Sequence, residues 1–208
     1  MPNDDAIYIK TRDALSPLKP ILQKWAELVI RYSNAFAGKD ACYWYNERAN
    51  IGVLAAAAWQ AEGEKWLALE EYGTQKRHGV GRCDLYVANK TVSFAVEAKL
   101  AWQNIGDRVS APYQQISEKW GQAWTDTGEL HKDEADHRVL ACFIAPRFPA
   151  SGKDVNLAEW REGLAREFSP DALAWVFPES SASLRNSRQR IYPGVCLLLQ
   201  TRKRANPQ

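Results

Sequence analysis

The chain of 208 residues is poor in the residues that build metal and redox centres. It has only three His and one Met, and its four cysteines lie far apart, with no Cys-x-x-Cys pair. This scatter argues against a zinc cluster and against a disulfide framework. We therefore interpret the cysteines as reduced and mostly buried thiols. They are Cys42, Cys83, Cys142 and Cys196.

The sequence also lacks a long apolar run and an excess of one charge. No stretch approaches the roughly 20 apolar residues that span a bilayer, and the polar start of the chain does not resemble a signal peptide. We therefore expect a soluble, cytoplasmic protein without membrane contact. Lys and Arg number 27 against 25 Asp and Glu, and this net charge of +2 does not decide between nucleic-acid and protein partners. With 46% hydrophobic residues, the chain is predicted to form a single domain, 1–208.

The segment 81–100 has the most informative pattern in the chain. Apolar and polar side chains alternate over 92–100, and the same alternation is present over 83–87. A period of two predicts two strands, each with one apolar face. A two-residue turn at Asn89-Lys90 would join them into a hairpin, because Asn tolerates the left-handed backbone of such turns.

This turn decides which side chains share a face of the sheet. If Ala88 faces Thr91, the apolar residues of both strands lie on one side, Cys83 included. Asp84 then lies on the other side, diagonal to Glu97 at roughly 7 Å, where two carboxylates can converge on one cation. A turn changed by one residue would place Asp84 alone in the core, at a high cost in free energy.

Lys99 follows Glu97 by two residues and is therefore predicted on the same face. Together with Asp84, these residues suit metal-assisted hydrolysis of a phosphodiester, because Mg²⁺ prefers carboxylate oxygens. The lysine could orient or help deprotonate the attacking water and offset negative charge. The alternative interpretation is a surface ion-pair group that contributes little stability.

Helical spacing before the hairpin adds a candidate carboxylate. One amphipathic helix is predicted over 17–37 and a second over about 41–61, where Glu47 shares the inward stripe of Ile51 and Leu54. The alternative is that Glu47 merely favours the positive end of the helix.

A strand predicted over 66–72 carries two rival carboxylates, Glu70 and Glu71. The glycine-containing segment 73–81 is predicted as a turn or mobile loop. Its basic cluster, 76–78, is interpreted as a solvated tip in preference to a phosphate contact.

The remaining elements are predicted from periodicity and turn residues. A third helix, opened by Ser110 and Pro112 and ending near Trp124, would place Gln115 and Lys119 beside the polar face of the sheet. The segments that follow are a polar loop, 125–137, a buried strand, 138–145, closed by Pro146, a helix, 156–168, and two short strands, 172–177 and 195–200.

This order of elements resembles the core of the PD-(D/E)XK nuclease superfamily. The resemblance covers residues 41–146 and is carried by Gly81-Arg82-Cys83-Asp84 and Glu97-Ala98-Lys99. Cys83 stands where the superfamily usually has proline. The resemblance implies a restriction-endonuclease-like α/β (α+β mixed) fold, in which a central mixed sheet is flanked by helices. Residues 1–40 would add an N-terminal helix, and 147–208 a C-terminal helix and strands.

The resemblance also implies an activity. Asp84, Glu97 and Glu47 would be the ligands of Mg²⁺ or Mn²⁺, and Lys99 would be the catalytic lysine. The implied enzyme is an endonuclease, with DNA as its favoured substrate.

Two further expectations come from the same resemblance. Some members place a glutamine at the site, which here would be Gln115, with Gln114 as the fallback. Some members have lost catalysis, so the alternative is a module that only binds nucleic acid or a protein partner. Many nucleases of this kind work as dimers, and a homodimer is therefore expected as well.

Overall fold

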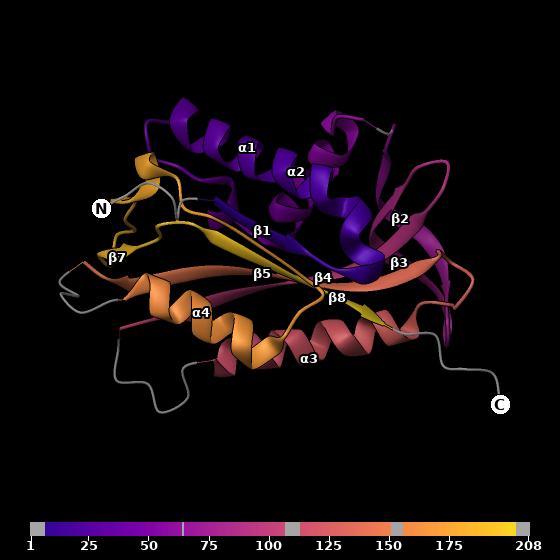
Figure 1. Cartoon of the computed structure of the whole chain (residues 1–208). Helices are drawn as coiled ribbons and strands as arrows, with labels where there is room; N and C mark the ends of the chain where they lie inside the picture. Colours follow the sequence, from indigo (N-terminus) through magenta and orange to yellow (C-terminus); the bar gives the residue numbers. More distant parts are fainter. Residues whose placement is uncertain (1–6, 64, 107–112, 151–155, 203–208) are drawn as a thin grey trace.

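The computed structural model describes residues 7–63, 65–106, 113–150 and 156–202. Within these ranges the chain forms a mixed β-sheet with helices on both faces (Figure 1). The α-helices are α1 (Lys19–Ala35), α2 (Glu47–Gln60), α3 (Gln114–Glu129) and α4 (Leu157–Phe168). The strands are β1 (Ile7–Thr11), β2 (Leu67–Lys76), β3 (Gly79–Ala88), β4 (Ser93–Asn104), β5 (His137–Pro149), β6 (Ala172–Val176), β7 (Arg190–Ile191) and β8 (Val195–Arg202).

The strands follow the order β1-β6-β8-β5-β4-β3-β2, and β7 pairs with the end of β5. β4 and β5 are parallel, and α3 makes the crossover between them; the other neighbours are antiparallel. The central position of β5 follows from its continuous apolar run, which is buried on both faces. This arrangement confirms the predicted α/β class with a central mixed sheet and flanking helices.

Two helix pairs cover the sheet. α1 and α2 lie over one face, and α3 and α4 lie over the other (Figure 1). The larger core lies under α1 and α2, where Trp25, Leu54, Phe94 and Phe143 are buried. All four cysteines are free and buried, as the sequence predicts. No helix in the described ranges is long and apolar enough to cross a membrane.

Several predicted boundaries are wrong. α2 begins at Glu47, because Asn46 caps it by accepting a hydrogen bond from the Ala49 amide at 2.9 Å; a short 3₁₀ turn, Cys42–Trp44, precedes the cap. The strand β1 was not predicted; it pairs with β6 at the edge of the sheet.

The predicted loop 73–81 is instead the end of a long hairpin, formed by the last residues of β2, a turn and the first residues of β3. Gly73 pairs with Arg82, and Gly81 pairs with Thr74, as ordinary ladder positions, and only residues 77–78 turn between β2 and β3. Glycine breaks local patterns in a sequence, but it keeps both backbone hydrogen-bonding groups, so cross-strand pairing overrides the local signal.

Two other boundaries lie further along the chain than predicted. α3 continues to Glu129, so part of the predicted loop 125–137 is helical. Ser110 and Pro112 fall outside the described residues. β5 does not end at Pro146 but continues to Pro149. Pro146 lies beyond Ile144↔Cys196, the last pair between β5 and β8. The missing N–H of this proline therefore removes no hydrogen bond to β8.

The turn between β3 and β4 is longer than predicted by two residues. Ala88 pairs with Ser93, so the loop spans 89–92, and the side chain of Asn89 accepts hydrogen bonds from the amides of Thr91 and Val92, each at 2.9 Å. Because the difference is even, the facing of the side chains near the turn is unchanged. Leu85 and Val87 accordingly pack in the main core with Phe94 and Val96.

Cys83 is the exception, and its predicted place on that face is wrong. It packs with Ala95, Leu130 and Ala135 on the opposite side of the sheet. The cause lies next to it, since Glu71 has a left-handed backbone (φ 51°) between the ladder pairs Glu70↔Leu85 and Tyr72↔Cys83. Strict alternation is broken there, and β3 stops pairing with β4.

Candidate functional site

The candidate site lies where β3 separates from β4. The last pair between these strands is Leu85↔Val96, so the remainder of β4 pairs with β5 alone and has an open edge on its other side. The Asp84 carboxylate lies at this point and accepts a hydrogen bond from the Ala98 amide through Oδ2 at 2.7 Å. With the observed register, Asp84 comes level with Glu97 and not with Ala95.

Glu47 reaches the same open edge from the first turn of α2. Its Oε2 accepts a hydrogen bond from the Leu100 amide at 3.2 Å, so two carboxylates take the place of a neighbouring strand on β4. Burial raises the pKa of Glu47; the positive charge of Lys99 lowers it, and the negative charge of Asp84 adds to the rise.

Glu97 is the most deeply buried carboxylate of the site, with 3% of its surface exposed. Lys76 donates a hydrogen bond from Nζ to Oε1 of Glu97 at 2.7 Å. Burial raises the pKa of Glu97 to about 7, although the hydrogen bond from Lys76 lowers it, and the charge of Asp84 adds to the rise. The chain thus holds a carboxylate beside a like charge, at a place where a cation would relieve the repulsion.

Lys99 is half-buried and forms an ion pair with Asp126 of α3, with 2.7 Å between Nζ and Oδ2. Nζ also donates a hydrogen bond to the Ala98 carbonyl at 3.0 Å. Burial alone would lower the pKa of Lys99, but Asp126 and the charges of Glu47 and Asp84 outweigh it and raise the pKa. Lys99 therefore remains protonated near neutral pH and is a fixed cation.

The other candidate carboxylates are placed differently. Glu71 forms ion pairs with Arg48 at 3.2 Å and with Arg82 at 3.0 Å. Glu70 is exposed on β2, near the middle of α2, where its Oε2 lies 3.6 Å from the position that a Cβ on Gly52 would take. Of the three glutamates, Glu47 is the one that the structure brings to the open edge of β4.

The two glutamines of α3 also differ. Gln115 lines the same cavity as Glu47. Gln114 donates a hydrogen bond at 3.1 Å to Glu118, which also lines this cavity, and both glutamines are exposed.

Two residues of the site were missed in the sequence. The sequence predicts Lys76 in a solvated tip, yet it binds Glu97. The end of the long hairpin pairs with the end of α3, through the bridge Lys76↔Leu130 and the hydrogen bond from the Arg77 amide to the Glu129 carbonyl. Asp126 was assigned to a loop, yet it pairs with Lys99. A helical reading beyond Trp124 would have found Asp126, since it follows Lys119 by seven residues and therefore shares its face of α3.

The arrangement does not form a closed metal cage. Among the described residues, no three His, Cys, Asp or Glu side chains converge on a point that could hold a metal ion. The hydrogen bonds to Asp84, Glu97 and Glu47 each engage one oxygen of the carboxylate. A donor set of one or two carboxylates still fits Mg²⁺, which keeps several waters and completes its shell with substrate phosphate.

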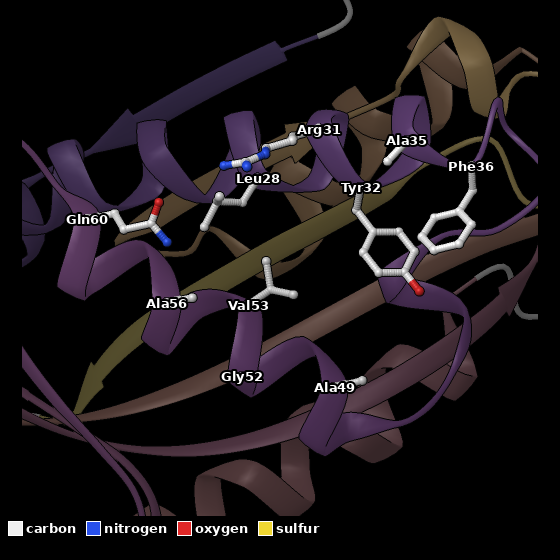
Figure 2. Close-up of a pocket in the computed structure, with 10 residues that line it drawn as sticks. All are labelled: Leu28, Arg31, Tyr32, Ala35, Phe36, Ala49, Gly52, Val53, Ala56 and Gln60. Atoms are coloured by element: carbon white, nitrogen blue, oxygen red, sulfur yellow. The ribbon is translucent and has the colours of Figure 1, made fainter.

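Residues of α2 take part in the lining of two hollows on the surface of the molecule. A cavity of about 440 Å³ adjoins the site and is lined by residues that include Glu47, Leu100, Trp102 and Lys119. A second hollow, about 420 Å³, lies between α1 and α2, where Leu28 and Val53 point toward each other (Figure 2). None of the predicted site residues lines this second, mostly apolar hollow.

Comparison with known protein families, curated proteins and solved structures gives no match to the chain.

Proposed function

We propose that the chain is a metal-dependent nuclease that hydrolyses phosphodiester bonds, with DNA as its favoured substrate. One observation carries the proposal: the carboxylates of Asp84, Glu97 and Glu47 and the ammonium of Lys99 gather where β3 leaves β4. The order of a helix, three antiparallel strands, a crossover helix and a parallel strand supports the same proposal.

The residues divide into two roles. Asp84 and Glu97 would hold Mg²⁺ or Mn²⁺, with Glu47 as a further carboxylate from the helix side. The ion, when bound, supplies Lewis acidity toward water and phosphate. Lys99, kept protonated by Asp126, would offset the negative charge that develops on the phosphate and orient the attacking water through a hydrogen bond.

A second function is favoured by one specific contact. The ion pair between Lys76 and Glu97 already neutralises the buried carboxylate with a cation of the chain itself. A retired nuclease fold that binds nucleic acid or a protein without cleaving it would have this property.

The test is cleavage of supercoiled plasmid, linear duplex, single strands and RNA with Mg²⁺, Mn²⁺ or EDTA. We expect metal-dependent cleavage that falls on the order of 10²-fold or more in Glu97→Gln, which removes the charge of a metal ligand, and in Lys99→Met, which removes the cation facing the phosphate.

Matched variants control for charge and for surface changes. Glu71→Gln removes a carboxylate that is paired with Arg48 and Arg82, and Lys24→Met removes a lysine that is paired with Glu27 at the surface. Both are expected to retain cleavage. Equal cleavage by Glu97→Gln and the wild type would overturn the assignment of the site. No cleavage by any sample, with salt-sensitive DNA binding retained, would favour the non-catalytic module.

A further inference from the structure

The cavity beside the candidate site lies between the start of α2, the start of α3 and the second half of β4. Its volume is about 440 Å³, within the range of ligand-binding pockets and large enough for one nucleobase with part of its sugar. Glu47 and Leu100 line the cavity, and the Leu100 amide donates a hydrogen bond to the Glu47 carboxylate. These two residues form the boundary between the cavity and the carboxylates of Asp84 and Glu97. A group bound in the cavity would therefore be a neighbour of the reacting phosphate.

Two aromatic rings in this cavity face solvent. Tyr45 is 53% exposed, and Trp102 is 41% exposed. The Tyr45 ring is held in place by the hydrogen bond that its hydroxyl donates to Asp40 at 2.7 Å. The guanidinium of Arg147 lies 6.0 Å from the Trp102 ring centroid, at the outer limit of a cation–π contact. Aromatic rings with exposed surface beside a polar site are the platforms on which unpaired bases stack.

The charges of the lining point to a neutral ligand. Lys119 and Arg147 are balanced by Glu47 and Glu118, so the cavity as a whole does not attract an isolated phosphate. The amide of Gln115 adds a donor and an acceptor of the kind that hydrogen-bonds to base edges. Arg147 is oriented by its hydrogen bond to Asn104 at 2.7 Å and supplies a cation at the border, where a flanking phosphate would pass.

We propose that this cavity binds an unpaired nucleobase adjacent to the phosphate at the carboxylate site, so that the substrate is single-stranded or locally unpaired nucleic acid. The inference rests on the proposed nuclease function. A base in a duplex is stacked and paired, and its face reaches a side chain only after strand separation or extrusion. Tyr45 and Trp102 contact the base, and the carboxylates act on the neighbouring phosphate.

Binding in EDTA tests the cavity separately from catalysis. The probes are a fluorescein-labelled 15-nucleotide thymidine strand and the same strand annealed to its complement, with fluorescence anisotropy as the readout. We expect Trp102→Ala to weaken binding of the single strand by roughly 5- to 150-fold, the range for loss of one stacked base. Binding of the duplex should change less than about twofold, and Trp102→Phe should restore most of the affinity because it keeps a ring.

Trp59→Ala is the matched control, since Trp59 is 57% exposed on α2 and does not line the cavity. It should bind both probes as the wild type does. The inference is overturned if the wild type does not bind the single strand, or if Trp102→Ala binds it as tightly as the wild type. It is also overturned if Trp102→Ala lowers the affinity for the single strand and for the duplex by the same factor.

The two proposals fail in different ways. Trp102-dependent binding of the single strand without metal-dependent cleavage would support the base-binding cavity and contradict the proposed nuclease activity. Cleavage that depends on Glu97 but not on Trp102, with single and double strands cut alike, would retain the nuclease and reject the unpaired base.

Discussion

Gly38 shows how one residue without a side chain limits the packing at the end of α1. Its backbone is left-handed, with φ 70°, and a Cβ at this position would lie 1.7 Å from the carbonyl oxygen of Ser180. That oxygen belongs to the backbone of a short 3₁₀ turn, Glu179–Ser181, so it cannot rotate away as a side chain could. The close approach connects the N-terminal helix to the C-terminal part of the chain.

Gly38→Ala should therefore lower the free energy of unfolding by roughly 2–5 kcal/mol, the sum of a left-handed alanine and an overpacked contact. Urea denaturation followed by tryptophan fluorescence measures the loss. Gly63→Ala is the control, because Gly63 is also left-handed (φ 88°) but a Cβ there meets nothing within 4 Å. It should cost only about 1–2 kcal/mol. Equal losses would mean that the contact with Ser180 contributes nothing.

At the scale of elements, the β3–β4 hairpin positions the site through its turn. Asn89 organises this turn with one side-chain oxygen, which accepts from the Thr91 amide, the Thr91 hydroxyl and the Val92 amide at 2.8–2.9 Å. The register fixed there places Asp84 level with Glu97 four pairs away. The turn thus fixes the pairing of β3 with β4 up to Leu85↔Val96, the pair next to Asp84 and Glu97.

Asn89→Ala should lower the free energy of unfolding by about 1–2 kcal/mol, because it leaves the turn amides without their acceptor. Asn89→Asp keeps an acceptor oxygen and should remain within about 0.5 kcal/mol of the wild type. Thermal unfolding of the two variants in parallel distinguishes these outcomes. An alanine variant as stable as the aspartate variant would assign the register to strand pairing alone.

The hairpin also shows what the sequence can and cannot predict. Alternation is a local property, so it is sufficient to predict that Glu97 and Lys99 share one face of β4. The predicted turn is two residues shorter than the observed one, and because this difference is even, the facing of the side chains near the turn is the same in both. It failed for Cys83, because the left-handed Glu71 lies on the neighbouring strand, where no pattern in 81–100 can reveal it. The partner Lys76 was missed for a similar reason, since its position depends on how far a hairpin extends and not on its own surroundings in the sequence.

At the scale of the whole molecule, the sheet brings residues from five elements to one edge. α2 contributes Glu47, β2 Lys76, β3 Asp84, β4 Glu97 and Lys99, and α3 Asp126. These elements are consecutive along the chain between Glu47 and Glu129, and the parallel crossover through α3 closes the site from the second face. Binding at the site is therefore coupled to the stability of the central sheet.

An ion bound by the folded chain should raise the melting temperature. With Mn²⁺ at about 10 to 100 times its dissociation constant, the stabilisation is roughly 1.4–2.7 kcal/mol, or a rise of roughly 3–10 °C for a chain of this size. Scanning calorimetry of the wild type and of Asp84→Asn at equal Mn²⁺ measures it. The variant should lose the rise, and Glu71→Gln should retain it; a rise of equal size in Asp84→Asn would place the ion elsewhere.

The two carboxylates on the open edge of β4 have a consequence for association. A strand with unpaired N–H groups is a template on which a strand of another molecule can add. At this edge Asp84 accepts a hydrogen bond from the Ala98 amide, and Glu47 accepts one from the Leu100 amide. The two carboxylates also place negative charge along the edge. A chain in which both are replaced by alanine would expose these amides in the middle of the sheet, and it would form edge-to-edge oligomers at concentrations where the wild type does not.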